Sequence, residues 1–153
     1  MKIAVVGTGA LGGWYAARLA LAGNEVHCIA RSDHAIITRR GLVIKYQGQE
    51  NIVKVASAQP HAHSVGPCDL VVVTTKSTSN AVLPELLRPL VGPSTIVLTL
   101  QNGMGNVEVI SQVLPLRSDR GGPLFCLYQP NGACLHRRNP GGLCANGSSP
   151  WRH

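Results

Sequence analysis

The sequence has few acidic side chains, few aromatic side chains and no long apolar run. Of its 153 residues, 14% are charged and 4% are aromatic, while 44% are hydrophobic. No apolar run reaches the roughly 18–20 residues that a membrane-spanning helix needs, so we expect no membrane partner. The composition also excludes collagen-like, coiled-coil and wholly disordered chains. The chain is long enough to bury one hydrophobic core.

The shortage of acidic residues gives a net charge of +7, which is unevenly distributed along the chain. Residues 1–115 hold nine basic and six acidic side chains, whereas residues 116–153 hold five Arg and one Asp. Gly, Pro and Cys also concentrate after residue 115, and the apolar periodicity ends there. We therefore predict one domain over residues 1–115 and an irregular tail, disordered or frameshifted, over 116–153. If this tail is translated out of frame, its basic side chains were not selected for binding, so we expect no nucleic-acid partner.

Cysteine pairs of the CxxC type are missing, which argues against a structural zinc site. The tail contains Cys126, Cys134, His136 and Cys144, but their spacings fit no common zinc pattern, so we predict no metal site. The apolar stretch after Lys2 is interrupted by glycines, which argues against a signal peptide. We therefore expect a cytoplasmic protein with reduced thiols.

Strands and helices alternate over residues 1–115. The pattern predicts buried strands at 2–6, 25–30, 69–74 and 95–100, a loose hairpin at 41–47 and 51–55, a surface loop at 58–67, and helices at 10–22, about 79–91 and about 106–114. In the first helix, the spacing of Leu11, Tyr15, Leu19 and Ala22 predicts one apolar face. Alternating strands and helices with hydrophobic strands predict an α/β fold with a doubly wound, mostly parallel sheet.

A glycine-rich loop connects the first strand to the first helix. Residues Gly7, Thr8, Gly9, Ala10, Leu11 and Gly12 form a GxGxxG pattern within a strand–helix–strand unit. In this context Gly7 permits a tight turn, Gly9 lets the backbone approach a pyrophosphate, and Gly12 lets the helix pack closely on the strand. The helix N-terminus offers unpaired N–H groups to phosphates. The loop therefore predicts a dinucleotide site in a Rossmann-type fold, against the alternative of a glycine-rich turn that binds nothing.

Arg31 stands at the end of the second strand, where NAD-binding units usually carry an acidic residue. A guanidinium suits the 2′-phosphate of NADP, because its planar fork meets phosphate oxygens bidentately. The alternative is a solvated arginine at a strand end. We predict NADP(H) as the cofactor.

Two polar residues follow the later strands. Lys76 ends the Val-Val-Val-Thr-Thr-Lys run, just after the strand at 69–74, and Asn102 begins the turn after the strand at 95–100. Because the carboxyl ends of parallel strands line the ligand crevice, both are candidates for binding cofactor and substrate. A solvated lysine and an Asn-Gly turn chosen for backbone reasons are the alternatives, and position alone favours neither side.

Three blocks of the sequence together resemble one family. KIAVVGTGALGGWYAARLALAGNEVHCIAR, DLVVVTTKS and LTLQNGMGN are similar, in this order, to the N-terminal domain of the ketopantoate reductases (2-dehydropantoate 2-reductases). The resemblance covers about residues 1–115. It implies an oxidoreductase that reduces a 2-keto acid with NADPH, in the pathway to pantothenate. It also implies that Gly7, Gly9 and Gly12 hold the pyrophosphate, that Arg31 holds the 2′-phosphate, and that Lys76 and Asn102 border cofactor and substrate.

The resemblance also implies a helical C-terminal domain that carries the catalytic lysine, and no helical pattern follows residue 115. We therefore expect a truncated chain that is inactive alone, and we assign no catalytic residue. The sequence leaves three questions open: whether the chain alone is an enzyme, what its oligomeric state is, and which keto acid is the substrate. The alternatives are a nucleotide-binding or regulatory module without catalysis, or a protein that uses FAD.

The tail has a possible origin in a frameshift. The codons that permit residues 118–133 also permit, one base forward, an apolar and strand-like string similar to the segment that the family carries after its LQNG helix. This predicts that the tail is an out-of-frame version of the family's normal continuation.

Overall fold

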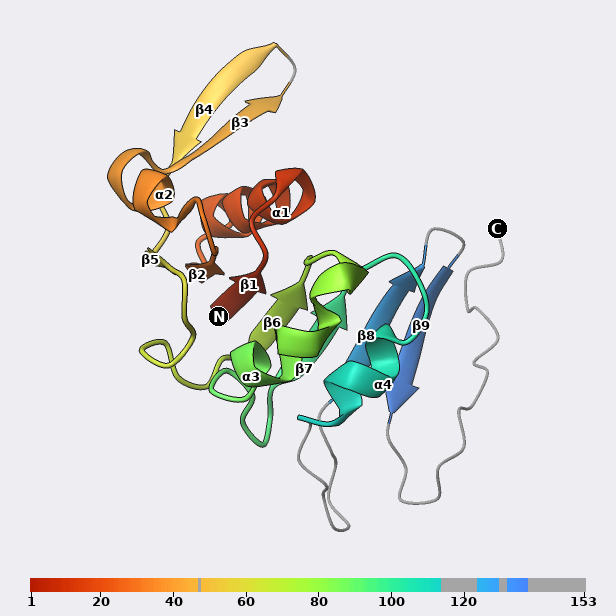
Figure 1. The fold of residues 1–153 in the computed structure, drawn as a ribbon. Coiled ribbons are helices and arrows are strands. Elements are labelled where there is room, and N and C mark those ends of the chain that lie inside the picture. The colour runs from red at the N-terminus through yellow and green to blue at the C-terminus, as the bar shows by residue number, and fades with distance from the viewer. Residues whose placement is uncertain (47, 114–123, 130–131, 138–153) are drawn as a thin grey trace.

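The computed structural model describes residues 1–46, 48–113, 124–129 and 132–137. Its main sheet has seven strands in the order β5-β2-β1-β6-β7-β8-β9, and β3 and β4 form a separate hairpin. The strands run parallel except for the antiparallel pair β8–β9. The chain leaves β1 toward β2 and later returns to β1's other side with β6, so the strand order reverses there (Figure 1). This is the doubly wound, Rossmann-type arrangement that the sequence predicts.

The elements follow one another with short connections. They are β1 (Lys2–Val6), α1 (Ala10–Leu21), β2 (Glu25–Ile29), α2 (His34–Arg40), β3 (Leu42–Tyr46), β4 (Gln49–Val53), β5 (Ser57–Gln59), β6 (Leu70–Val73), the 3₁₀ helix η1 (Ser77–Val82), α3 (Leu83–Leu87), β7 (Ile96–Thr99), α4 (Asn106–Ser111), β8 (Leu124–Gln129) and β9 (Gly132–Arg137). The predicted strands at 2–6, 25–30, 69–74 and 95–100 are confirmed within a residue or two at their ends.

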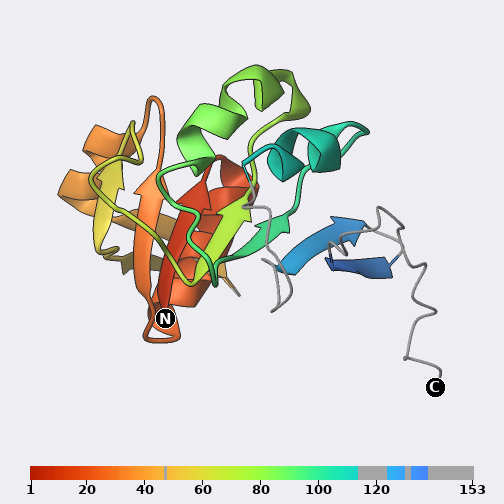
Figure 2. The ribbon, with the colours of Figure 1, turned by 90° about the horizontal axis from the view of Figure 1, so that it is seen from below.

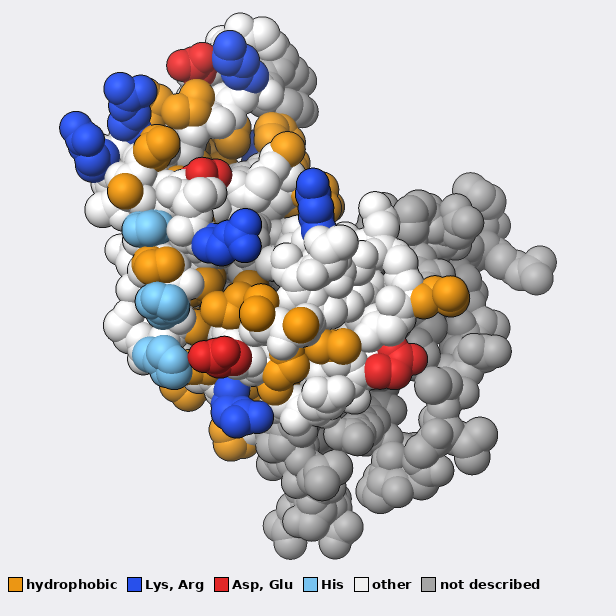
Figure 3. Space-filling view, viewed as in Figure 1, with side chains coloured by type: hydrophobic (Ala, Val, Ile, Leu, Met, Phe, Trp, Pro, Cys, Tyr) orange, Lys and Arg blue, Asp and Glu red, His pale blue; other side chains and the backbone are white. Residues whose placement is uncertain are grey.

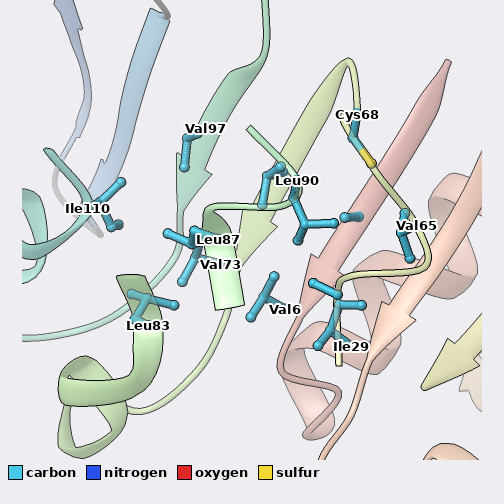
Figure 4. Close-up of a cluster of buried hydrophobic side chains, with 13 residues drawn as sticks. Val6, Ile29, Val65, Cys68, Val73, Leu83, Leu87, Leu90, Val97 and Ile110 are labelled. Carbon is cyan, nitrogen blue, oxygen red and sulfur yellow. The ribbon is translucent and has the colours of Figure 1, made fainter. Parts of the chain in front are cut away.

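Both faces of the sheet are buried, because successive residues of a strand point to opposite sides. From β1, Ala4 and Val6 join one cluster with Leu83 and Leu87 of α3 and Ile110 of α4, whereas Ile3 and Val5 join a second cluster that faces α1. Figure 4 shows the first cluster between β6, β7 and the two helices, and Figure 2 shows α3 and α4 on one side of the sheet. The near-continuous apolar strands in the sequence are explained by this two-sided burial.

The buried face of α1 differs from the predicted one. Leu11 and Tyr15 are exposed, whereas Gly12, Ala16 and Ala17 are buried against the sheet. The predicted apolar face is therefore wrong at Leu11 and Tyr15, whereas Leu19 packs against the buried cluster that faces α1. Small residues make the contact because they let the helix axis approach the strands closely.

Three further local differences lie in the connections. α2 and β5 were not predicted, and β5 occupies part of the predicted surface loop at 58–67 while it pairs with β2 at the sheet edge. The predicted helix at 79–91 is a 3₁₀ turn followed by the five-residue α3. Pro84 lies in the first turn of α3, where proline is tolerated because its missing N–H would have no partner.

The sheet continues past residue 115. β8 pairs with β7 in parallel, and β9 pairs with β8 in antiparallel. The expectation that residues 116–153 are irregular is therefore wrong for 124–129 and 132–137. Residues 114–123, 130–131 and 138–153 lie outside the described residues, and the frameshift origin of this region stays a prediction. Among the described residues, no helix is long and apolar enough to cross a membrane.

Candidate functional site

The glycine loop begins where β1 ends, at the reversal of strand order between β1 and β6. Gly7 has a φ of 93°, which a residue with a side chain rarely adopts, and its N–H donates to Ile29 O at 2.9 Å. Thr74, just after β6, donates its hydroxyl to the carbonyl oxygens of Val6 and Gly7. The loop is thus fixed from both neighbouring strands, β2 and β6.

Gly12 and Gly9 have opposite surroundings. A Cβ on Gly12 would lie 1.9 Å from Gly7 O, so the first turn of α1 packs directly on the loop. A Cβ on Gly9 would meet nothing within 4 Å. The missing side chain of Gly12 therefore lets α1 pack on the loop, and the missing side chain of Gly9 leaves open space in front of the helix.

The N-terminus of α1 faces this open space. Gly9 is its N-cap, no side chain caps the helix, and its first turn holds no acidic residue. The N–H groups of the first turn of a helix have no partner within the helix, and its dipole is positive at that end. A phosphate group suits such an end, because its oxygens can accept hydrogen bonds from these N–H groups.

A pocket of about 440 Å³ opens beside the loop. Its walls come from the glycine loop, from α1, from Asp33 and from the strand β3 of the hairpin. The lining residues are Thr8, Gly9, Ala10, Gly13, Trp14, Asp33, Leu42, Val43, Ile44 and Lys45. The structure therefore brings Thr8, Gly9 and Ala10 together around a space of ligand size. Leu11 belongs to the predicted loop but does not line this pocket.

Arg31 follows β2 and is exposed, one residue after the buried Ala30. The neighbouring Ser32 donates its hydroxyl to Asp33 Oδ1 at 2.8 Å. Arg31 is not among the residues that line the pocket, although Asp33 is. Basic side chains also gather over α2 and the hairpin, where Arg39 and Arg40 end α2 (Figure 3).

Lys76 and Asn102 are both exposed, in the loops that follow β6 and β7. Their immediate neighbours are hydrogen-bonded: Gln101 Nε2 donates to Thr75 Oγ1 at 3.1 Å. Gly103 also lies against Ser77, because a Cβ built on it would be 3.7 Å from Ser77 Oγ. The structure therefore brings the two predicted loops into contact at the same edge as the glycine loop.

Sequence reasoning missed two groups of residues at this edge. The first is the pocket wall made by Trp14, Asp33 and β3, which depends on where the hairpin folds back and has no motif of its own. The second is a set of buried or part-buried amides and hydroxyls, Gln101, Asn80, Asn106, Thr75 and Thr99. The sequence signal for the second set was three amide residues within six positions, at 101, 102 and 106, after a buried strand.

The residues present fit a dinucleotide. The open space at Gly9, the uncapped helix N-terminus and the cationic Arg31 at the end of β2 suit a pyrophosphate and a further phosphate. Among the described residues there is no group of three His, Cys, Asp or Glu side chains that would hold a metal ion. The side chains of Cys126, Cys134 and His136, and all of Cys144, lie outside the description.

Comparison with known proteins identifies the family of this chain. The family model of ketopantoate reductase PanE/ApbA matches residues 3–138. The chain belongs to the ketopantoate reductase family. The match continues past residue 115, where the resemblance seen in the sequence ends, and through β8 and β9.

Individual relatives agree with this assignment. A ketopantoate reductase relative from Nostoc sp., described as a 2-dehydropantoate 2-reductase, is 39% identical over 132 residues, which are 86% of this chain and 41% of that protein. A solved 2-dehydropantoate 2-reductase from Geobacter metallireducens has a TM-score of 0.69 and 35% identity, over 90% of this chain and 49% of that one. The chain therefore spans less than half the length of these ketopantoate reductase relatives.

A second similar structure has a different description. It is a D-mandelate dehydrogenase in a ternary structure with NADH and anilino(oxo)acetate, and it has a TM-score of 0.68 and 26% identity over 83% of this chain and 40% of that one. The fold thus occurs in a protein solved with NADH.

Proposed function

We propose that this chain is the NADPH-binding domain of a reductase that acts on a 2-keto acid such as 2-dehydropantoate. The observation that carries the proposal is the uncapped helix N-terminus and open space at Gly9, at the reversal of strand order, in a chain of the ketopantoate reductase family. When bound, NADPH supplies the hydride for the reduction of the keto group.

The glycine loop binds the pyrophosphate. We assign the phosphate contacts to the backbone N–H groups of the loop and of the first turn of α1, from Thr8 to Gly12, so Ala10 and Leu11 contribute through their backbones. Gly7 sets the turn, and Gly12 holds the helix against the loop. These groups need no side-chain chemistry, because the binding energy comes from unpaired backbone donors and the helix dipole.

Arg31 binds the 2′-phosphate and thereby selects NADPH over NADH. A charge-assisted, bidentate contact contributes about 1.5–3 kcal/mol, which is roughly ten- to a hundredfold in affinity. Asp33 lines the pocket two residues away and holds the Ser32 hydroxyl. Its negative charge opposes a bound phosphate and reduces that selectivity.

Lys76 and Asn102 border the nicotinamide ribose and the substrate. The ammonium group of Lys76 suits the carboxylate of a 2-keto acid, and the amide of Asn102 both donates and accepts hydrogen bonds. Both side chains are exposed in the loops after β6 and β7, so they can contact a ligand without rearrangement of the core.

We also propose that the 153 residues bind the cofactor and reduce no 2-keto acid by themselves. Reduction of a ketone needs a proton donor held against the developing alkoxide. The family resemblance assigns that donor to a lysine of the helical domain rather than to a residue at this crevice. NADPH oxidation that depends on ketopantoate, measured with the purified chain, would contradict this part.

The test of the cofactor assignment is a set of titrations with NADPH, NADH and FAD on the wild type, Arg31→Ala and Arg88→Ala. Arg88 is an exposed arginine after α3, so its variant removes the same charge away from the glycine loop. We expect the wild type to prefer NADPH, Arg31→Ala to lose most of that preference, and Arg88→Ala to keep it. Equal wild-type affinities for NADPH and NADH would refute the role of Arg31, and binding of FAD alone would refute the cofactor class.

A further inference from the structure

Five buried or part-buried polar side chains form a cluster beside Lys76 and Asn102. We call it the amide cluster: Thr75, Asn80, Thr99, Gln101 and Asn106. Thr99, Gln101 and Asn106 are buried, with exposed fractions of 0%, 7% and 2%. Buried polar side chains destabilise the fold unless they are hydrogen-bonded. These three side chains therefore need hydrogen-bond partners inside the protein.

Gln101 uses its whole amide within this cluster. Its Nε2 donates to Thr75 Oγ1 at 3.1 Å and to Asn80 Oδ1 at 3.0 Å, and its Oε1 accepts from Thr99 Oγ1 at 3.1 Å. Gln101 thereby connects the segment after β6, the helix η1 and the end of β7.

The chain of hydrogen bonds continues into the Asn102 loop. Asn80 Nδ2 donates to Asn106 Oδ1 at 2.8 Å, and Asn106 Nδ2 donates to Gly103 O at 3.0 Å and to Asn102 O at 3.4 Å. The backbone oxygens of the exposed loop are therefore fixed from below. Gly103 and Gly105 both have positive φ, at 102° and 82°, so this loop depends on such contacts to keep one conformation.

The two ends of this chain lie next to the two candidate ligand-binding side chains. Thr75 precedes Lys76, and the carbonyl that Asn106 holds belongs to Asn102 itself. In Figure 1 the strands β6 and β7 point toward the same edge, with η1 and α4 following them. Removal of a cluster residue can therefore displace Lys76 and Asn102 even though that residue does not itself contact a ligand.

We propose that Gln101 is a positioning residue that holds Lys76 and Asn102 at a fixed separation for the nicotinamide half of the cofactor. This inference rests on the proposed function, since it assumes that Lys76 and Asn102 contact the cofactor. Gln101 acts through these two residues and not on the adenosine half, which the glycine loop and Arg31 bind.

The test uses Gln101→Met, which keeps the size of the side chain and removes its three hydrogen bonds, in titrations of the full chain with NADPH and with adenosine 2′,5′-bisphosphate. The second ligand carries the adenosine, the 2′-phosphate and one 5′-phosphate but no nicotinamide. We expect the affinity for NADPH to fall about five- to tenfold and the affinity for the bisphosphate to change less than about twofold. The same substitution in a Lys76→Ala/Asn102→Ala background should then have little further effect, because residues that act through one another are not additive.

Thr95→Val is the matched control. Thr95 lies at the opposite end of β7, is 1% exposed, and donates its hydroxyl to Cys68 O at 2.6 Å while it accepts from Gly92 N. Thr95→Val removes this buried hydroxyl just before the same strand, so we expect a lower melting temperature and an unchanged affinity for NADPH. Thr95→Val thus separates loss of stability from loss of positioning.

Three results would overturn the proposal: an unchanged NADPH affinity in Gln101→Met, an equal loss for the bisphosphate, or a full effect that persists without Lys76 and Asn102. If Gln101→Met does not fold, Asn80→Ala carries the same predictions, because it breaks the link between Gln101 and Asn106 at a part-buried position. Failure of the wild type to bind NADPH would instead refute the proposed function, so the two failures are distinguishable.

Discussion

Two neighbouring parts of the same sheet edge are built in different ways. After β1, the site consists of backbone and of small residues, with Gly7 in a tight turn, Gly12 packed on the loop and Gly9 facing open space. After β6 and β7, the loops are held by the amide cluster, in which side chains donate to side chains and to loop carbonyls. We refer to these parts as the glycine half and the amide half.

The difference shows what each half can tolerate. The glycine half depends on missing side chains, so almost any substitution adds atoms where there is no room or where a ligand should lie. The amide half depends on the identity of side chains, so a substitution of equal size removes hydrogen bonds without a clash. Substitutions should therefore change stability and binding in separate patterns in the two halves.

The largest effect is expected for Gly12→Ala. Its Cβ would lie 1.9 Å from Gly7 O and 2.4 Å from Thr74 Oγ1, so α1 must move away from the loop. We expect a loss of about 3 kcal/mol in the free energy of unfolding, measured by chemical denaturation. A change below about 0.5 kcal/mol would show that the helix does not pack on the loop as described.

Gly9→Ala should have the opposite pattern. Gly9 has a φ of −63°, which alanine adopts readily, and a Cβ there meets no protein atom within 4 Å. We expect the free energy of unfolding to change by about 0.5 kcal/mol or less, and the affinity for NADPH to fall about tenfold, or about 1.4 kcal/mol. An unchanged affinity would place the pyrophosphate elsewhere.

Thr74→Val tests the connection between the halves. Thr74 follows β6 and donates its hydroxyl to the carbonyl oxygens of Val6 and Gly7 in the glycine half. We expect a loss of about 1 kcal/mol in stability, because valine keeps the shape and removes the hydrogen bonds. Thr38→Val is a control, since its exposed hydroxyl donates to Ala58 O away from the site, and its loss should cost less.

The smallest effect concerns the buried thiol of Cys28, which lies in the core cluster beneath α1. Burial raises the pKa of Cys28 from 9.0 to about 12. The unfolded chain therefore ionises this thiol from about pH 9 while the folded chain keeps the proton, so stability is present below pH 9 and is lost as pH rises toward 12.

Denaturation of the wild type and of Cys28→Ala at several pH values measures this loss. Between about pH 8 and about pH 9.5 the wild type should lose about 0.8 kcal/mol that the variant keeps. Parallel stability curves for the two proteins would show that Cys28 is not desolvated in the folded state.

The sequence predicts the glycine half better than the amide half, for a physical reason. The roles of Gly7 and Gly12 follow from local backbone geometry, which a short motif between a strand and a helix determines. Strands β1, β2, β6 and β7 were likewise predictable, because burial on both faces leaves continuous apolar runs.

The rest depends on contacts between residues far apart in the chain. Gln101 and Asn80 are 21 positions apart, and nothing in either segment alone indicates that they bond. The face of α1 was predicted wrongly at Leu11 and Tyr15 because the pattern weighs large side chains, whereas close packing selects Gly12, Ala16 and Ala17. The strands β8 and β9 were missed because their segment contains Gly and Pro and shows no apolar periodicity, although their pairing extends the sheet.

Amide hydrogen exchange of the chain with and without NADPH tests the central claim most directly, namely that one cofactor contacts both halves. The account predicts that NADPH protects backbone amides in residues 8–13 and in residues 101–106. Adenosine 2′,5′-bisphosphate should protect the first segment and leave the second unchanged. Protection by NADPH of only one segment, or of neither, would contradict the account.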